Sequence, residues 1–149
     1  MSQTYFGSTL RAGSGTLTDT VDGGYVVLTQ SVTVTTVAAG TAVSGTITLP
    51  AQSQIVNFFL DQVTDETVGG GTATAINATI GTAAAGTQYL SSTNVIAGGR
   101  ASLTFTAAQL TAMSNIGANQ SVVLTLAPNG TISTTQGVYN LTVVYAQKV

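Results

Sequence analysis

The feature that most constrains this fold is a series of short segments in which apolar and polar residues alternate. The clearest segment is Gly137–Gln147, where every second residue is large and apolar: Tyr139, Leu141, Val143 and Tyr145. Successive side chains of a β-strand point to opposite faces, so a period of two predicts a strand with one buried face.

Similar segments recur along the chain, separated by glycines, Pro50 and the turn signal Asn129-Gly130. We expect further strands at Tyr25–Val37, Thr46–Leu49, Ile55–Val63, Thr72–Ile80, Gln88–Leu90, Val95–Ile96, Ala101–Thr106 and Ser121–Ala127. One short helix is expected at Thr106–Met113, with Thr106 as its N-cap and with Leu110 and Met113 on one face. About eight short strands with regular turns predict an all-β fold, a jelly-roll-like β-sandwich.

The stretch Thr46–Leu90 contains the densest apolar run, Ile55–Leu60. Alternation within this run places three side chains on one strongly apolar face: Val56, Phe58 and Leu60. Three glycines, 69–71, then precede the small-residue strand Thr72–Ile80. We therefore expect two core strands joined as a hairpin with a flexible tip.

A chain of 149 residues is long enough for one domain with its own core. We assign residues 25–149 to the β-sandwich and residues 1–24 to an extended N-terminal arm, because these first residues are rich in Gly, Ser and Thr. Two interpretations of the arm stay open. It is either a disordered terminus or a segment that docks on a neighbouring subunit.

Charged residues are scarce, at 5% of the chain against about 25% in an ordinary soluble domain. A surface of uncharged polar residues resists association poorly, which favours a subunit that packs beside copies of itself over a secreted monomer. Three basic residues cannot form a cationic stripe, so nucleic acid is not expected as a partner. No apolar run resembles a signal peptide or a membrane span, so we expect synthesis in a cytoplasm and no membrane contact.

Catalytic groups are also scarce, because the chain has no His and no Cys. We expect no enzyme activity, no catalytic residues and no cofactor. The only acidic cluster is Asp61, Asp65 and Glu66, which could supply oxygen ligands to Ca²⁺. Its spacing matches no EF-hand pattern, so solvated carboxylates without a metal are the preferred interpretation. Five aromatic residues could line a ligand groove but are expected in the core at strand spacing: Phe58, Phe59, Phe105, Tyr139 and Tyr145.

The order of strands and turns over residues 44–147 resembles the head decoration (cement) proteins of tailed bacteriophages. The resemblance rests on four successive stretches: ITLPAQSQIVNFFLDQVT, GGGTATAINATIGTAAAGTQYL, GGRASLTFTAAQLTAM and SVVLTLAPNGTISTTQGVYNLTVVYAQ. Residues 1–43 are less similar to that family.

The resemblance implies a virion protein on the capsid exterior that binds the major capsid protein, forms homotrimers at local three-fold positions and stabilises the shell. An alternative is a head or tail fibre or receptor-binding module that recognises a host glycan, for which we expect an exposed cluster of aromatic and Asn/Asp residues. A bacterial adhesin or pilin-like subunit is disfavoured, because the sequence shows no export signal.

Overall fold

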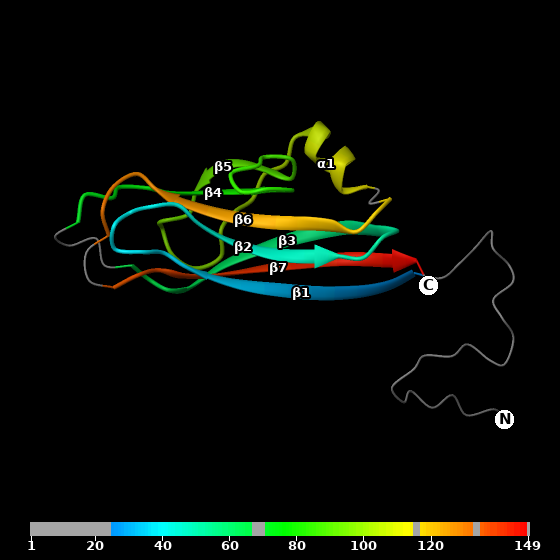
Figure 1. Ribbon diagram of the computed structural model, residues 1–149, viewed down its shortest axis with the longest axis horizontal. Coiled ribbons are helices and arrows are strands. Elements are labelled where there is room, and N and C mark those ends of the chain that lie inside the picture. The colour runs from blue at the N-terminus through cyan, green and yellow to red at the C-terminus, as the bar shows by residue number, and fades with distance from the viewer. Residues whose placement is uncertain (1–24, 67–70, 115–116, 133–134, 149) are drawn as a thin grey trace, which may run out of the picture.

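The computed structural model describes residues 25–66, 71–114, 117–132 and 135–148 and shows two antiparallel β-sheets packed face to face (Figure 1). The three-stranded sheet contains, in spatial order, β1 (Tyr25–Thr35), β7 (Val138–Lys148) and β3 (Ser53–Thr64). The four-stranded sheet contains β2 (Val43–Leu49), β6 (Gln120–Pro128), β4 (Ile76–Gly81) and β5 (Leu90–Asn94). The prediction of an all-β sandwich is confirmed.

The chain forms four antiparallel pairs nested one inside the other. The innermost pair is β4 with β5, followed by β3 with a single bridge between Asp61 and Arg100, then β2 with β6, and finally β1 with β7. This nesting is that of a jelly roll, whose eight strands form two Greek keys. Its eighth strand is reduced here to the bridge at Arg100, which leaves seven full strands among the described residues.

The core lies between the sheets and centres on β7, β6 and β4, the three strands that each have neighbours on both sides. The four inward residues predicted for the last strand are all buried: Tyr139, Leu141, Val143 and Tyr145. In β6, five consecutive residues from Val122 to Leu126 are buried. Its outer face is partly covered by the turn after β4, because Ala85 N donates a hydrogen bond to Thr125 Oγ1 at 2.9 Å.

The expected hairpin between Ile55–Val63 and Thr72–Ile80 is wrong. β3 pairs with β7, whereas β4 pairs with β5 and β6 in the opposite sheet. β4 also begins only at Ile76, and the glycine tip falls largely outside the described residues. The chain therefore crosses between the two sheets between β3 and β4.

The placement of Val56 in the core is also wrong, since this side chain is 57% exposed. A register shift between Ile55 and Asn57 inserts one extra residue into β3 opposite β7. Such a bulge shifts the alternation by one residue. Ile55 is therefore buried on the same face as Phe58 and Leu60.

Three predicted strands and part of the helix differ from expectation. The segments Gln88–Leu90 and Val95–Ile96 are replaced by one strand between them, β5, and residues 101–106 form no strand. Helix α1 (Ala107–Met113) has the predicted cap, with Gln109 N donating to Thr106 Oγ1 at 3.3 Å. Met113 is buried as predicted, but Leu110 is 55% exposed. Gln109 is buried instead, and its Nε2 donates to Ser91 Oγ in β5 at 3.0 Å.

Candidate interaction surface

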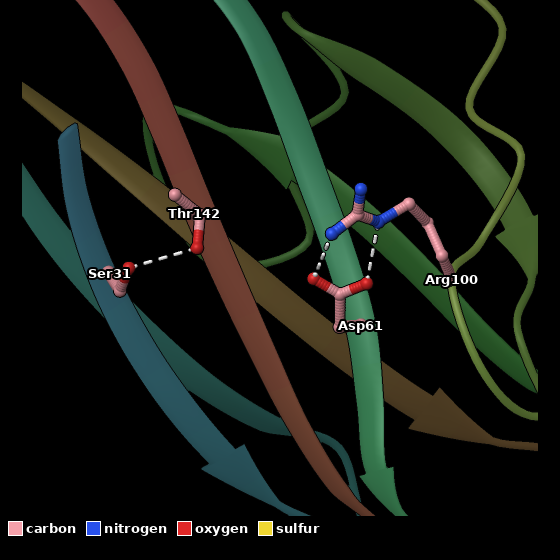
Figure 2. A network of polar contacts seen from close by, with 4 residues as sticks. All are labelled: Ser31, Asp61, Arg100 and Thr142. Atoms are coloured by element: carbon pink, nitrogen blue, oxygen red, sulfur yellow. Dashed lines mark hydrogen bonds and ion pairs between the residues drawn. The ribbon is translucent and has the colours of Figure 1, made fainter.

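The outer edge of β3 carries an ion pair between Asp61 and Arg100. Arg100 Nε donates to Asp61 Oδ1 at 2.7 Å and its second nitrogen donates to Oδ2 at 3.1 Å, in the two-pronged geometry that Figure 2 shows. The guanidinium also lies 4.7 Å from the ring centroid of Phe59, a cation–π distance. Backbone bonds on both sides of Arg100, from Gln62 N to Gly99 O and from Ala101 N to Leu60 O, hold this segment along β3.

Each member of this ion pair stabilises the charged form of the other. The hydrogen bond from Arg100 lowers the pKa of Asp61, and the same contact raises the pKa of Arg100. The side chains are 62% (Arg100) and 31% (Asp61) exposed, so water screens their attraction. The pair therefore orients the chain at this edge more than it stabilises the fold.

A second polar cluster joins the end of β3 to β7. Glu66 Oε2 accepts hydrogen bonds from Gln62 Nε2 at 2.6 Å and from the Tyr139 hydroxyl at 3.0 Å. Burial of the Tyr139 hydroxyl, followed by the nearby charge of Glu66, raises the pKa of this tyrosine. Tyr139 therefore stays neutral and acts as a fixed hydrogen-bond donor between the two strands.

These contacts bear on the metal hypothesis for Asp61, Asp65 and Glu66. Asp61 is occupied by Arg100, and Glu66 is occupied by Gln62 and Tyr139. Within the described ranges, no group of three or more acidic, His or Cys side chains is arranged to hold a metal ion. Asp61 and Glu66 are close in the sequence, but their carboxylates bind different partners in the fold.

The five aromatic residues do not line a groove. Phe58, Tyr139 and Tyr145 are buried, Phe105 packs half-buried against the core, and Phe59 lies beneath Arg100. Tyr89, which sequence reasoning did not single out, completes the cluster with its ring centroid 5.8 Å from that of Phe58. The expectation that these aromatic residues serve the core is confirmed for the three buried ones.

The other edge of the three-stranded sheet, β1, is different in character. Its outward side chains are Val27, at 63% exposure, and a row of hydroxyl residues, of which Ser31 bonds to Thr142 of β7 with the oxygens 2.9 Å apart (Figure 2). The inward residue Leu28 remains 39% exposed. Leu28, Val32 and Val34 share the inner face of β1, but the cover over this face is incomplete at Leu28.

None of the described helices has the length and apolar character required to cross a bilayer.

Comparisons with known proteins show similarity in fold. No protein-family model matches the chain, and no curated protein matches it. A solved structure described as "Cyanophage Pam1 capsid asymmetric unit" contains a chain with the same fold, with a TM-score of 0.52 and 20% sequence identity. The similarity covers 94% of this chain and 94% of that chain.

Proposed function

We propose that this protein is a structural component of a phage virion that associates with the capsid. The observation that carries the proposal is the fold shared over 94% of both chains with a member of a cyanophage capsid asymmetric unit. The two chains are alike over nearly their whole length, so the likeness is not confined to one common substructure.

Within this role, we assign the chain to the capsid exterior as a decoration protein bound to the major capsid protein, as homotrimers at local three-fold positions. The sequence resemblance over residues 44–147 supports this finer assignment. The scarcity of charge supports it as well, because two surfaces covered with Thr, Ser and Asn exchange hydrogen bonds without burying unpaired charges. Repetition over a symmetric shell makes modest contacts collectively strong.

The proposal includes no reaction. The chain contains no His or Cys, Tyr139 is held neutral, and the Asp61 carboxylate is paired with Arg100. The glycan-binding alternative calls for exposed aromatic residues at one end of the sandwich, and three of the five candidates are buried instead. No observation on the structure favours that alternative.

The test is binding to capsids that lack this protein. Purified protein is mixed with expanded capsids, sedimented and imaged by cryo-electron microscopy, and the temperature of shell rupture is measured with and without it. We expect density on the outer surface and a higher rupture temperature. Protein that stays in the supernatant at saturating concentration, or density only inside the shell, contradicts the proposal.

A shortened chain tests the role assigned to the arm. Removal of residues 1–20 is expected to lower capsid occupancy while the melting temperature of the sandwich stays unchanged, because all described strands begin at or after Tyr25. The full-length chain is the matched control. Equal occupancy for both chains removes the arm from the proposal and leaves the capsid association itself intact.

A further inference from the structure

β1 is a long and regular sheet edge. Among the described residues it pairs with β7 alone, and the register runs without a shift from Tyr25 opposite Lys148 to Thr35 opposite Val138. No other described strand pairs with the outer side of β1. A straight edge of this length is a template for pairing with another chain.

Natural edge strands are usually protected by charges, prolines, bulges or short length. β1 has none of these, and no charged residue occurs anywhere from Tyr25 to Leu60. The remaining long edge of this sheet is protected, since β3 has two register shifts and carries the segment of Arg100. In the other sheet both edge strands are shorter, with seven residues in β2 and five in β5. β1 is thus the longest regular and uncharged edge among the described strands.

The pattern of β1 fits a second copy of itself. Because the strand runs from residue 25 to residue 35, two antiparallel copies overlap fully when the two-fold axis passes Gln30. Each inward residue then faces an inward residue, with Val26 opposite Val34 and Leu28 opposite Val32. Outward residues also match, with Tyr25 opposite Thr35, Val27 opposite Thr33, and Thr29 opposite Ser31. We propose that β1 of one copy pairs with β1 of another in this register, which joins two three-stranded sheets into one sheet of six strands.

The exposure of Leu28 supports this partner. Leu28 is opposite the buried Tyr145 and so belongs to the inner face, yet it is 39% exposed. Val32 and Val34, by contrast, pack so closely over Gly45 of β2 that a Cβ there would lie 2.9 Å and 2.5 Å from their methyl carbons. In the proposed pair, Leu28 meets the partner's Val32, and the partner's β2 lies beneath it. Each copy therefore covers the part of the inner face of β1 around Leu28 that is exposed in the other copy.

The strength of the contact follows from its size. Eleven paired residues extend about 36 Å, and the two sheets are about 10 Å apart, so the paired edges meet over roughly 360 Å² per copy in projection. At about 720 Å² for both copies together, the contact is below the roughly 1,000 Å² of a stable specific interface, so association in solution is weak, and a high local concentration strengthens it. A two-fold contact closes a dimer and is separate from the three-fold contact of the proposed trimer. The inference concerns free protein and does not depend on capsid binding.

A single cysteine tests the position of the axis, because the chain has no other thiol. In the proposed register Gln30 of one copy lies opposite Gln30 of the other, with their Cβ atoms about 5 Å apart. We expect the variant Gln30→Cys to form a disulfide-linked dimer at least about tenfold faster under mild oxidation than Val63→Cys, which is more exposed but lies on β3. Equal rates for the two variants overturn the proposal.

The register is tested by placing like or opposite charges across the proposed contact and measuring how strongly each variant associates. The double variant Thr29→Lys/Ser31→Lys places two lysines opposite two lysines across the axis, whereas Thr29→Lys/Ser31→Glu places each lysine opposite a glutamate. Both variants lose the same Ser31–Thr142 hydrogen bond. By analytical ultracentrifugation, we expect the dissociation constant of the first to exceed that of the second by about tenfold or more.

Melting curves of both double variants confirm that each remains folded. Association that is equal in the two, or a wild-type mass that does not rise with concentration up to the millimolar range, overturns the proposal. The capsid-binding assay described above separates this outcome from a failure of the proposed function.

Discussion

The two edges of the three-stranded sheet differ in how well they are protected from pairing with another chain. The β3 edge is bulged, charged and bridged by Arg100, and its inner residue Leu60 is fully buried. The β1 edge is regular and uncharged, and its inner residue Leu28 is partly exposed. An edge that is complete within one chain is protected from other chains, whereas an incomplete edge keeps surface for a partner.

The sharpest test of this comparison is the same substitution at both edges. Leu60→Ala is expected to lower the free energy of unfolding by about 2–5 kcal/mol, because it leaves a cavity at a fully buried site. Leu28→Ala is expected to cost about 1 kcal/mol or less in the monomer. Chemical denaturation at low protein concentration measures both. Similar losses at the two sites mean that the edges do not differ in completeness.

A smaller effect is expected where β1 packs over β2. The Cβ added by Gly45→Ala would lie 2.5 Å from Val34 Cγ2, so the two strands must separate, at a cost of about 1–3 kcal/mol. Val34→Ala removes the clashing methyl group, and the double variant should be more stable than the sum of the single effects. Gly117→Ala is the control, because nothing lies within 4 Å of its Cβ position. Additive effects of the two substitutions contradict this packing.

The smallest effect is expected at the ion pair of the β3 edge. Asp61→Asn should shift the melting temperature by no more than about 2 °C at pH 7, because the pair is exposed. The folded state lowers the pKa of Asp61, so the contribution of the carboxylate is present above the unfolded pKa of about 3.9 and is lost as pH falls through the lower folded value. The difference between wild type and variant should therefore vanish in acid. A difference that grows below pH 4 contradicts a lowered pKa of Asp61 in the folded state.

Much of the fold could be predicted from local patterns. The alternation in β7, the burial of Phe58 and Leu60 in β3, and the cap at Thr106 all appear in the structure as expected. The errors fall where a distant contact decides the outcome. The bulge at Val56 depends on the register against β7, and burial of Gln109 in place of Leu110 depends on Ser91 in β5.

The candidate surface was less accessible to prediction. Asp61 and Arg100 are 39 residues apart in the sequence, and no local period links them. The adjacent carboxylates Asp61, Asp65 and Glu66 suggested one acidic site, yet the fold assigns Asp61 and Glu66 to different partners. Proximity along the chain is a poor guide to proximity in a sheet, where neighbours come from distant segments.

The sequence alone determined that this chain is a β-sandwich with few charges, because side-chain alternation and composition are properties of each segment by itself. Only the tertiary structure decided that β3 joins β7 rather than β4, and that β1 keeps an open edge. The physical reason is that backbone hydrogen bonds are the same for every strand. The choice of partner therefore depends on how all the strands pack together.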